Sequence, residues 1–174
     1  MVLATFDSGV YQLFLYLHIL SAIIGFGSVM LNGVYAAQAR QRPGREGLAI
    51  FEANSFVSLR IAEYAIYGVF VFGLITALLG DPVIEFSDFW LSAAMALYIA
   101  AIVISHTVMI PSTKKMGVLL TRLAEGPPPG AAAGGRPPEV AEVEALGKRL
   151  GTFGAILNLI VLVVLYLMVV KPGA

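Results

Sequence analysis

The stretch Tyr11–Ala37 contains no Asp, Glu, Lys or Arg, and it limits the possible folds of this chain more than any other feature. A helix of about 20 apolar residues crosses a bilayer, so this stretch is long enough to span one. Its polar and small residues recur at alternating spacings of three and four, which places them on one helical face. Because hydrocarbon does not satisfy polar groups, we expect this face to look inward at other helices. It holds His18, Ser21, Gly25, Ser28 and Asn32.

The composition of the whole chain is typical of an integral membrane protein. Hydrophobic residues make up 59% of the chain, charged residues 13%, and the mean hydropathy is +0.87. Soluble domains are about 25% charged. The formal net charge is zero, so we expect no nucleic-acid partner. The chain has no cysteine, which excludes disulfides, thiolate-bound metal and thiol nucleophiles.

Four apolar segments predict an all-α, four-helix, up-and-down bundle that forms a single domain, residues 1–174. The expected spans are about 11–37, 61–80, 89–111 and 150–170. Most cations lie between spans one and two or between spans three and four, and only Lys171 lies on the other side. The positive-inside rule makes the basic loops cytoplasmic, so both termini lie outside the cytoplasm. We therefore expect a multi-pass protein of the cell inner (plasma) membrane, with the lipid bilayer as its partner.

The segments between the spans carry further signals. Leu48–Leu59 is expected to extend span two as a helix below the membrane, and Lys114–Leu123 to lie on the membrane surface as an amphipathic helix. Residues 126–136 read as a flexible linker rich in Gly, Pro and Ala, and the Pro-Pro-Glu that follows predicts a helix start that runs into span four. Trp90 is placed for an interfacial aromatic belt.

A layer of polar residues is expected near the cytoplasmic side of the bundle, with at least one member from each span. Arg60 and Glu63 are three residues apart and can pair on one face of span two. Ionisable groups inside a membrane are costly and face a partner or water. The layer is therefore either a structural network that fixes the bundle or the lining of a path. Its members are Asn32, Arg60, Glu63, His106 and Asn158.

His18 is the candidate cofactor ligand, because a histidine this deep on the inward face needs a partner. Helical bundles hold haem through histidines on facing helices. His106 is expected about 20 Å away along the membrane normal, so the two histidines do not suit one haem. Met95 is expected at the depth of His18, and His with Met is an axial pair for haem b that also suits copper. The alternative is that Met95 is ordinary core filling.

The start of span one, Leu17-His18-Ile19-Leu20-Ser21-Ala22-Ile23-Ile24-Gly25-Phe26-Gly27, resembles the first helix of a large family of predicted four-helix bacterial integral membrane proteins of unassigned function. More distantly, a histidine followed by a Phe-Gly pair resembles the membrane-bound haem-binding protoporphyrinogen oxidases and the membrane domain of copper-resistance proteins. The resemblance implies that His18 binds haem or metal. The chain has Gly25 where a tryptophan commonly precedes the Phe-Gly pair of the oxidases, so it does not imply oxidase activity.

Three functions are compatible with these observations. The first is a redox or haem-handling protein that binds haem or a metal. The second is a small transporter or channel whose path is lined by the polar layer. The third is a non-catalytic subunit or assembly factor that acts as a homo-oligomer or within a larger membrane complex. No hydrolase triad, phosphate-binding Gly-rich loop or zincin helix is present, which favours a protein that is not an enzyme without deciding it.

Overall fold

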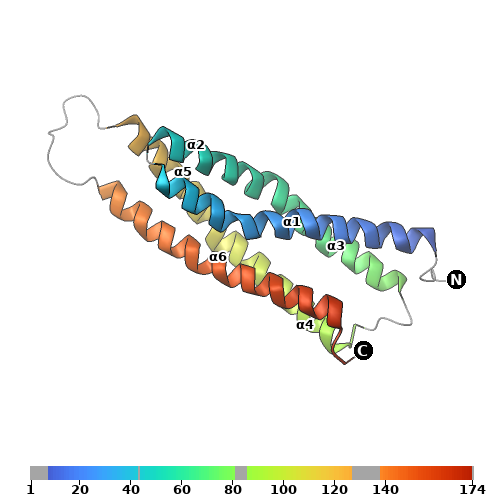
Figure 1. Ribbon diagram of the computed structural model, residues 1–174. Helices are drawn as coiled ribbons and strands as arrows, with labels where there is room; N and C mark the ends of the chain where they lie inside the picture. Colours follow the sequence, from blue (N-terminus) through green and yellow to red (C-terminus); the bar gives the residue numbers. More distant parts are fainter. Residues whose placement is uncertain (1–7, 43, 81–85, 127–137, 174) are drawn as a thin grey trace.

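A computed structural model of the chain describes residues 8–42, 44–80, 86–126 and 138–173. These residues form four long helical rods (Figure 1). Two of the rods change from α-helix to π-helix and back, so they carry several labels. The elements are α1 (Gly9–Gln41), α2 (Arg45–Phe56), the π turn η1 (Val57–Ala62), α3 (Glu63–Leu79), α4 (Phe89–Ile104), the π turn η2 (Ser105–Met109), α5 (Ile110–Glu125) and α6 (Pro138–Val170).

Local sequence signals explain where the rods begin and turn. Ser8 caps α1, with its Oγ accepting a hydrogen bond of 3.2 Å from the amide of Tyr11. Between α1 and α2 the chain reverses at Gly44, whose φ of 78° favours glycine. Gly47 packs so closely on the end of α1 that a Cβ there would lie 2.0 Å from the carbonyl oxygen of Arg42. This close approach sets the two rods side by side.

The rods associate as two pairs. Helix α1 packs along α3, and α6 packs along α4 and α5; α1 also contacts α6, and α2 contacts α5 (Figure 1). In contrast, α3 and α4 share at most a marginal backbone contact. Side chains bridge them instead: the Phe70 and Tyr98 rings stack with centroids 5.5 Å apart, and the Tyr98 hydroxyl donates to the carbonyl of Ile66. The side of the bundle formed by α3 and α4 is therefore the loosest.

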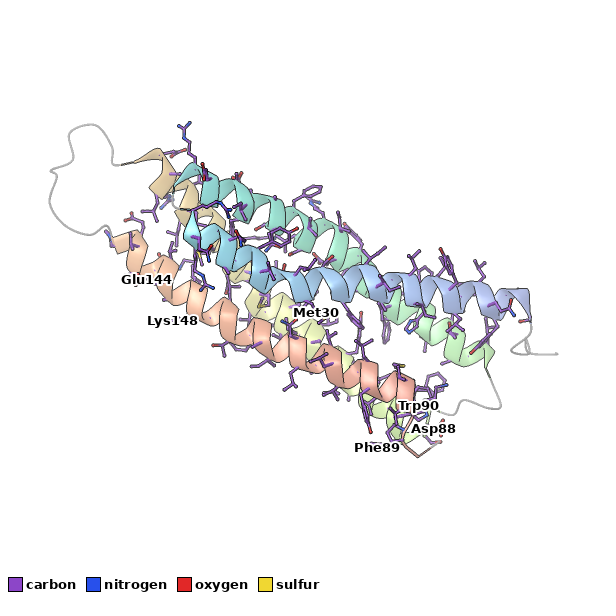
Figure 2. The ribbon with its side chains drawn as sticks, viewed as in Figure 1. Met30, Asp88, Phe89, Trp90, Glu144 and Lys148 are labelled. Atoms are coloured by element: carbon purple, nitrogen blue, oxygen red, sulfur yellow. The ribbon has the colours of Figure 1, made fainter. Side chains whose placement is uncertain are left out.

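Two groups of buried apolar side chains mark the two ends of the bundle. One joins α4 and α6 near the start of α4 and contains Trp90, Leu91, Ala94, Val164 and Leu167, together with Ala77 of α3. Trp90, labelled in Figure 2, is only 4% exposed. Trp90 lies at the end of α4, as an interfacial position requires, but its ring is packed between helices, with the Lys171 ammonium 5.2 Å from its centroid. The indole fills the space between α4 and α6 and does not face lipid.

The second buried group lies at the opposite end and joins α5 to α6. It consists of Met116, Leu119 and Leu146, with Phe51 of α2 against it. The expectation that Lys114–Leu123 lies on the membrane surface is wrong, because α5 continues directly from α4 and η2 as one rod. Its apolar face is covered by α6, and Lys115 forms an ion pair with Glu142 of α6. This end also carries the exposed cations of α1, α2, α5 and α6, and we call it the basic end.

The four rods are long and apolar enough to cross a membrane, which confirms the predicted helix bundle with four candidate spans. In their most apolar windows only 6% to 22% of the residues are buried. A soluble protein does not expose apolar side chains on this scale. The rods have 33 to 37 residues, so at about 1.5 Å per residue each exceeds the roughly 30 Å of hydrocarbon by about 20 Å. Helix α1 begins and α6 ends at the end opposite the basic end (Figure 1).

The other local expectations have mixed outcomes. Arg45–Phe56 and η1 do extend span two, and α6 runs without a break from Pro138 to Val170, both as predicted. Of the predicted linker, residues 127–136 lie outside the described part of the chain. The orientation of the bundle relative to the cytoplasm stays a prediction.

Candidate functional site

Three side chains from α3 and η2 form a continuous hydrogen-bonded chain. The Tyr67 hydroxyl lies 2.7 Å from Glu63 Oε1 and 2.7 Å from His106 Nε2. The other ring nitrogen of His106, Nδ1, lies 3.0 Å from the carbonyl oxygen of Ile102 one turn earlier. Glu63 Oε1 and His106 Nε2 are themselves 3.7 Å apart, so the tyrosine oxygen is the bridge between an acid and a base. We call Glu63, Tyr67 and His106 the relay.

Local helix geometry places the three groups together. Glu63 and Tyr67 are four residues apart on α3 and therefore share a face. His106 lies within η2, where the amide of Ile110 bonds the carbonyl of Ser105, five residues back. Pro111 follows directly; a proline has no amide hydrogen and its ring crowds the carbonyl of the residue four before it, so a wider turn relieves the crowding. Sites of function are frequent at such π turns.

Proton accounting shows what the relay can do. His106 Nδ1 can only donate to the Ile102 carbonyl, because that oxygen has no hydrogen to give. In one arrangement Nε2 also carries a hydrogen and donates to Tyr67, which donates to an ionised Glu63. In the other, a protonated Glu63 donates to Tyr67, which donates to the lone pair of Nε2. The two arrangements hold the same number of protons and differ by one proton passed from the imidazolium to the carboxylate through the tyrosine hydroxyl.

A cavity of about 70 Å³ adjoins the relay. Its walls come from all four rods and are largely apolar, with Glu63, Tyr67, Tyr98, Ser105 and His106 as the polar members. A cavity of this size holds more than one water molecule when polar partners are present. The relay therefore borders a small, largely apolar volume between the four rods.

The depth of the relay follows from helical rise. Counting about 1.5 Å per residue, Glu63 lies about 24 Å from the Leu79 end of α3, and His106 about 25 Å from the Phe89 end of α4. A hydrocarbon layer of roughly 30 Å that begins at these two helix ends would enclose both groups, with about 5 Å to spare toward the basic end. Glu63 and His106 of the predicted polar layer thus lie at one depth and are connected through Tyr67.

Arg60 does not take part in the relay. Its side chain is exposed, and among the described residues it has no ion-pair partner. The predicted pairing of Arg60 with Glu63 assumed an α-helix, in which residues three apart share a face. Between them lies η1, where the amide of Glu63 bonds the carbonyl of Ser58, five residues back. The wider turn rotates the two side chains apart, and Glu63 instead accepts a hydrogen bond from Tyr67.

The two asparagines of the predicted layer lie apart from the relay. Asn32 Oδ1 accepts a hydrogen bond of 2.9 Å from the Ser58 hydroxyl, which ties α1 to η1. Asn158 on α6 has a buried Oδ1 with no hydrogen-bond partner among the described residues. Of the five predicted members, the structure therefore joins Glu63 and His106 through Tyr67 and places Asn32 in a separate contact.

His18 packs into a notch on α3. Its Nδ1 lies 2.8 Å from the carbonyl oxygen of Val69, and a Cβ on Gly73 would lie 2.8 Å from the ring. The absence of a side chain at Gly73 is what admits the imidazole. A backbone carbonyl on Nδ1 orients many metal-binding histidines, but here it also satisfies a polar group in the α1–α3 interface without any cofactor.

Met95 belongs to a different interface from His18. It packs against the buried group that joins α4 and α6, and neither residue lines the central cavity. Haem-sized ligands occupy pockets of about 300 Å³ or more, and the cavity is far smaller. The cavity is therefore not a haem site, and a haem shared by His18 and Met95 stays a prediction. Among the described residues no three His, Asp or Glu side chains cluster as a metal site. Haem binding by His18 stays a prediction.

Sequence reasoning missed Tyr67 as a site residue. Its signal is the spacing of four from Glu63, which puts a hydroxyl within reach of the only carboxylate in span two. It also missed Tyr98 and Ser58, which satisfy backbone and amide oxygens across helix interfaces. A tyrosine near the end of a span is usually an interfacial anchor, which hides a role of this kind.

Comparisons with known proteins add no relative: no family model, no curated protein and no solved structure matches the chain. The class of protein is therefore defined by the fold alone, as an all-helical bundle with four candidate membrane spans. The resemblance of its first helix to membrane proteins of unassigned function stays a prediction.

Proposed function

We propose that this protein is a small transporter or channel of the cell inner membrane in which Glu63, Tyr67 and His106 pass protons. The observation that carries the proposal is the unbroken acid–hydroxyl–base chain, with both bonds of Tyr67 at 2.7 Å. A structural network needs only satisfied bonds. This one has two arrangements of equal proton count, which is what a relay requires. Ionisable groups held inside membrane bundles mark proton and ion pathways.

The position of the relay supports its place in a path. With the basic end in the cytoplasm, Glu63 and His106 lie about 5 Å inside the cytoplasmic boundary of the hydrocarbon. From there the cavity leads to Tyr98 and Val164, which lie nearer the Phe89 end of α4 and the Val170 end of α6. Water in this cavity would take a proton from the relay and carry it inward. The relay is then the cytoplasmic half of the path. Protons are either the transported species or the ions whose movement drives transport of another solute.

The test is proton flux in proteoliposomes that contain a pH-sensitive dye, with a potassium diffusion potential as the driving force. We expect flux from the wild-type chain and its loss in Glu63→Gln and Tyr67→Phe. Tyr64→Phe is the matched control: it makes the same substitution one position after Glu63, on a ring that is 66% exposed and makes no hydroxyl bond in the described structure. Flux that is unchanged in both relay variants, or a wild-type chain without flux, refutes the proposal.

A further inference from the structure

The outer surface of α3 and α4 carries polar groups at a depth where lipid tails are expected. The His106 side chain is 44% exposed, the Glu63 side chain 27%, and Tyr64 is 66% exposed. Arg60 is also exposed, and it lies one turn before Tyr64 on the same rod. Ionisable side chains that face hydrocarbon are costly, so such a surface requires a cover.

The charges on this surface complement one another between copies but not within one copy. Arg60 has no ion-pair partner among the described residues. Glu63 accepts from Tyr67 through Oε1, which leaves Oε2 for a second donor. The π turn η1 keeps Arg60 and Glu63 of one chain apart. In a twofold-symmetric dimer every contact between different residues occurs twice, so Arg60 of each copy would meet Glu63 of the other.

The shapes of the two helices are also complementary. The exposed side of α4 carries small side chains at spacings of four, Ser92, Ala96 and Ala100, and small residues let helices approach closely in lipid. The exposed side of α3 carries larger side chains, including Tyr64 and Val71. Each α3 can therefore pack into the α4 surface of a second copy. This is the side of the bundle where α3 and α4 have little backbone contact of their own.

We infer that the α3–α4 surface is the interface of a homodimer whose twofold axis runs along the membrane normal. Arg60 of each copy pairs with Glu63 of the other, Val71 packs over the small side chains of the second α4, and Tyr64 lies against Val103 at the same depth. The pairing removes Arg60, Glu63 and His106 from contact with lipid. It also places the two relays beside the axis, so that a transport path would be lined by both copies. The interface is inferred from exposed charge and shape, so it can be refuted independently of the proposed transport.

Because the chain has no cysteine, single-cysteine variants give an unambiguous test. Tyr64 and Val103 lie at similar depths on α3 and α4, and both are exposed. Copies that carry Tyr64→Cys and copies that carry Val103→Cys, each with its own affinity tag, are co-expressed and oxidised in native membranes. We expect a mixed disulfide dimer. Ile24→Cys is the control, because Ile24 is exposed at a similar depth on α1, which is not part of the proposed interface.

Arg60 variants test the ion pair. Arg60→Glu should reduce the mixed cross-link several-fold, while Arg60→Lys should retain it. Tyr67→Phe should lower proton flux by about tenfold or more without changing the cross-link, which separates the two proposals. An absent mixed disulfide overturns the inference. A cross-link that forms equally with Ile24→Cys also overturns it. So does a light-scattering mass of one chain for the protein in lipid nanodiscs; the surface would then be covered by lipid or by another protein.

Discussion

Replacing Tyr67 with phenylalanine removes the one oxygen atom that joins Glu63 to His106. The remaining separation between Glu63 Oε1 and His106 Nε2 is 3.7 Å, which is longer than a normal hydrogen bond. The ring itself stays, so the packing of Tyr67 against Tyr64 and His106 is preserved. The variant therefore cuts the relay with a minimal change of shape, and we expect proton flux to fall by about tenfold or more, since a positioned acid or base contributes about 10²–10⁴-fold.

The cost in stability should be small. Side-chain hydrogen bonds in membrane proteins contribute about 0.6 kcal/mol each on average, so two lost bonds amount to about 1 kcal/mol. For a chain of this length that corresponds to a fall in Tm of about 2–4 °C. Thermal unfolding in detergent, followed by circular dichroism, gives this value, and pH-sensitive dye in proteoliposomes gives the flux. A variant that loses about 1 kcal/mol and keeps full flux would refute the relay and leave a purely structural network.

Three further expectations concern glycine positions and the cofactor. Gly73→Ala should lower stability by about 1–3 kcal/mol, because its Cβ would lie 2.8 Å from the His18 ring; Gly27→Ala, with open space around the added Cβ, should be neutral or stabilising in the same unfolding assay. Gly47→Ala should separate α1 from α2, because its Cβ would meet two backbone carbonyl oxygens, and cross-linking between these helices should decrease. If His18 binds haem, protein purified from a haem-replete host should show a Soret band that His18→Ala removes; colourless wild-type protein would contradict that prediction.

The sequence was sufficient to predict the four spans, because each lies within one long apolar rod and hydrocarbon permits few alternatives. Of the predicted polar layer, Glu63 and His106 do lie at one depth, whereas Asn32 contacts Ser58 nearer the basic end. The sequence failed to predict which groups meet. Arg60 and Glu63 read as a pair at α-helical spacing, but the π turn η1 rotates them apart. Trp90 read as a belt residue, but it fills the α4–α6 interface. Both errors concern rotation about a helix axis, which composition does not determine.

The two π turns adjoin the relay. Each inserts a wider turn into a rod near the same depth, one just before Glu63 and the other around His106. The spacing of four within α3 places Glu63 beside Tyr67 whatever precedes it. The wider turn η1 separates Arg60 from Glu63, so the carboxylate is not paired with the cation of its own helix. The same turn thus keeps Glu63 available to Tyr67 and exposes the charge that we assign to the dimer interface.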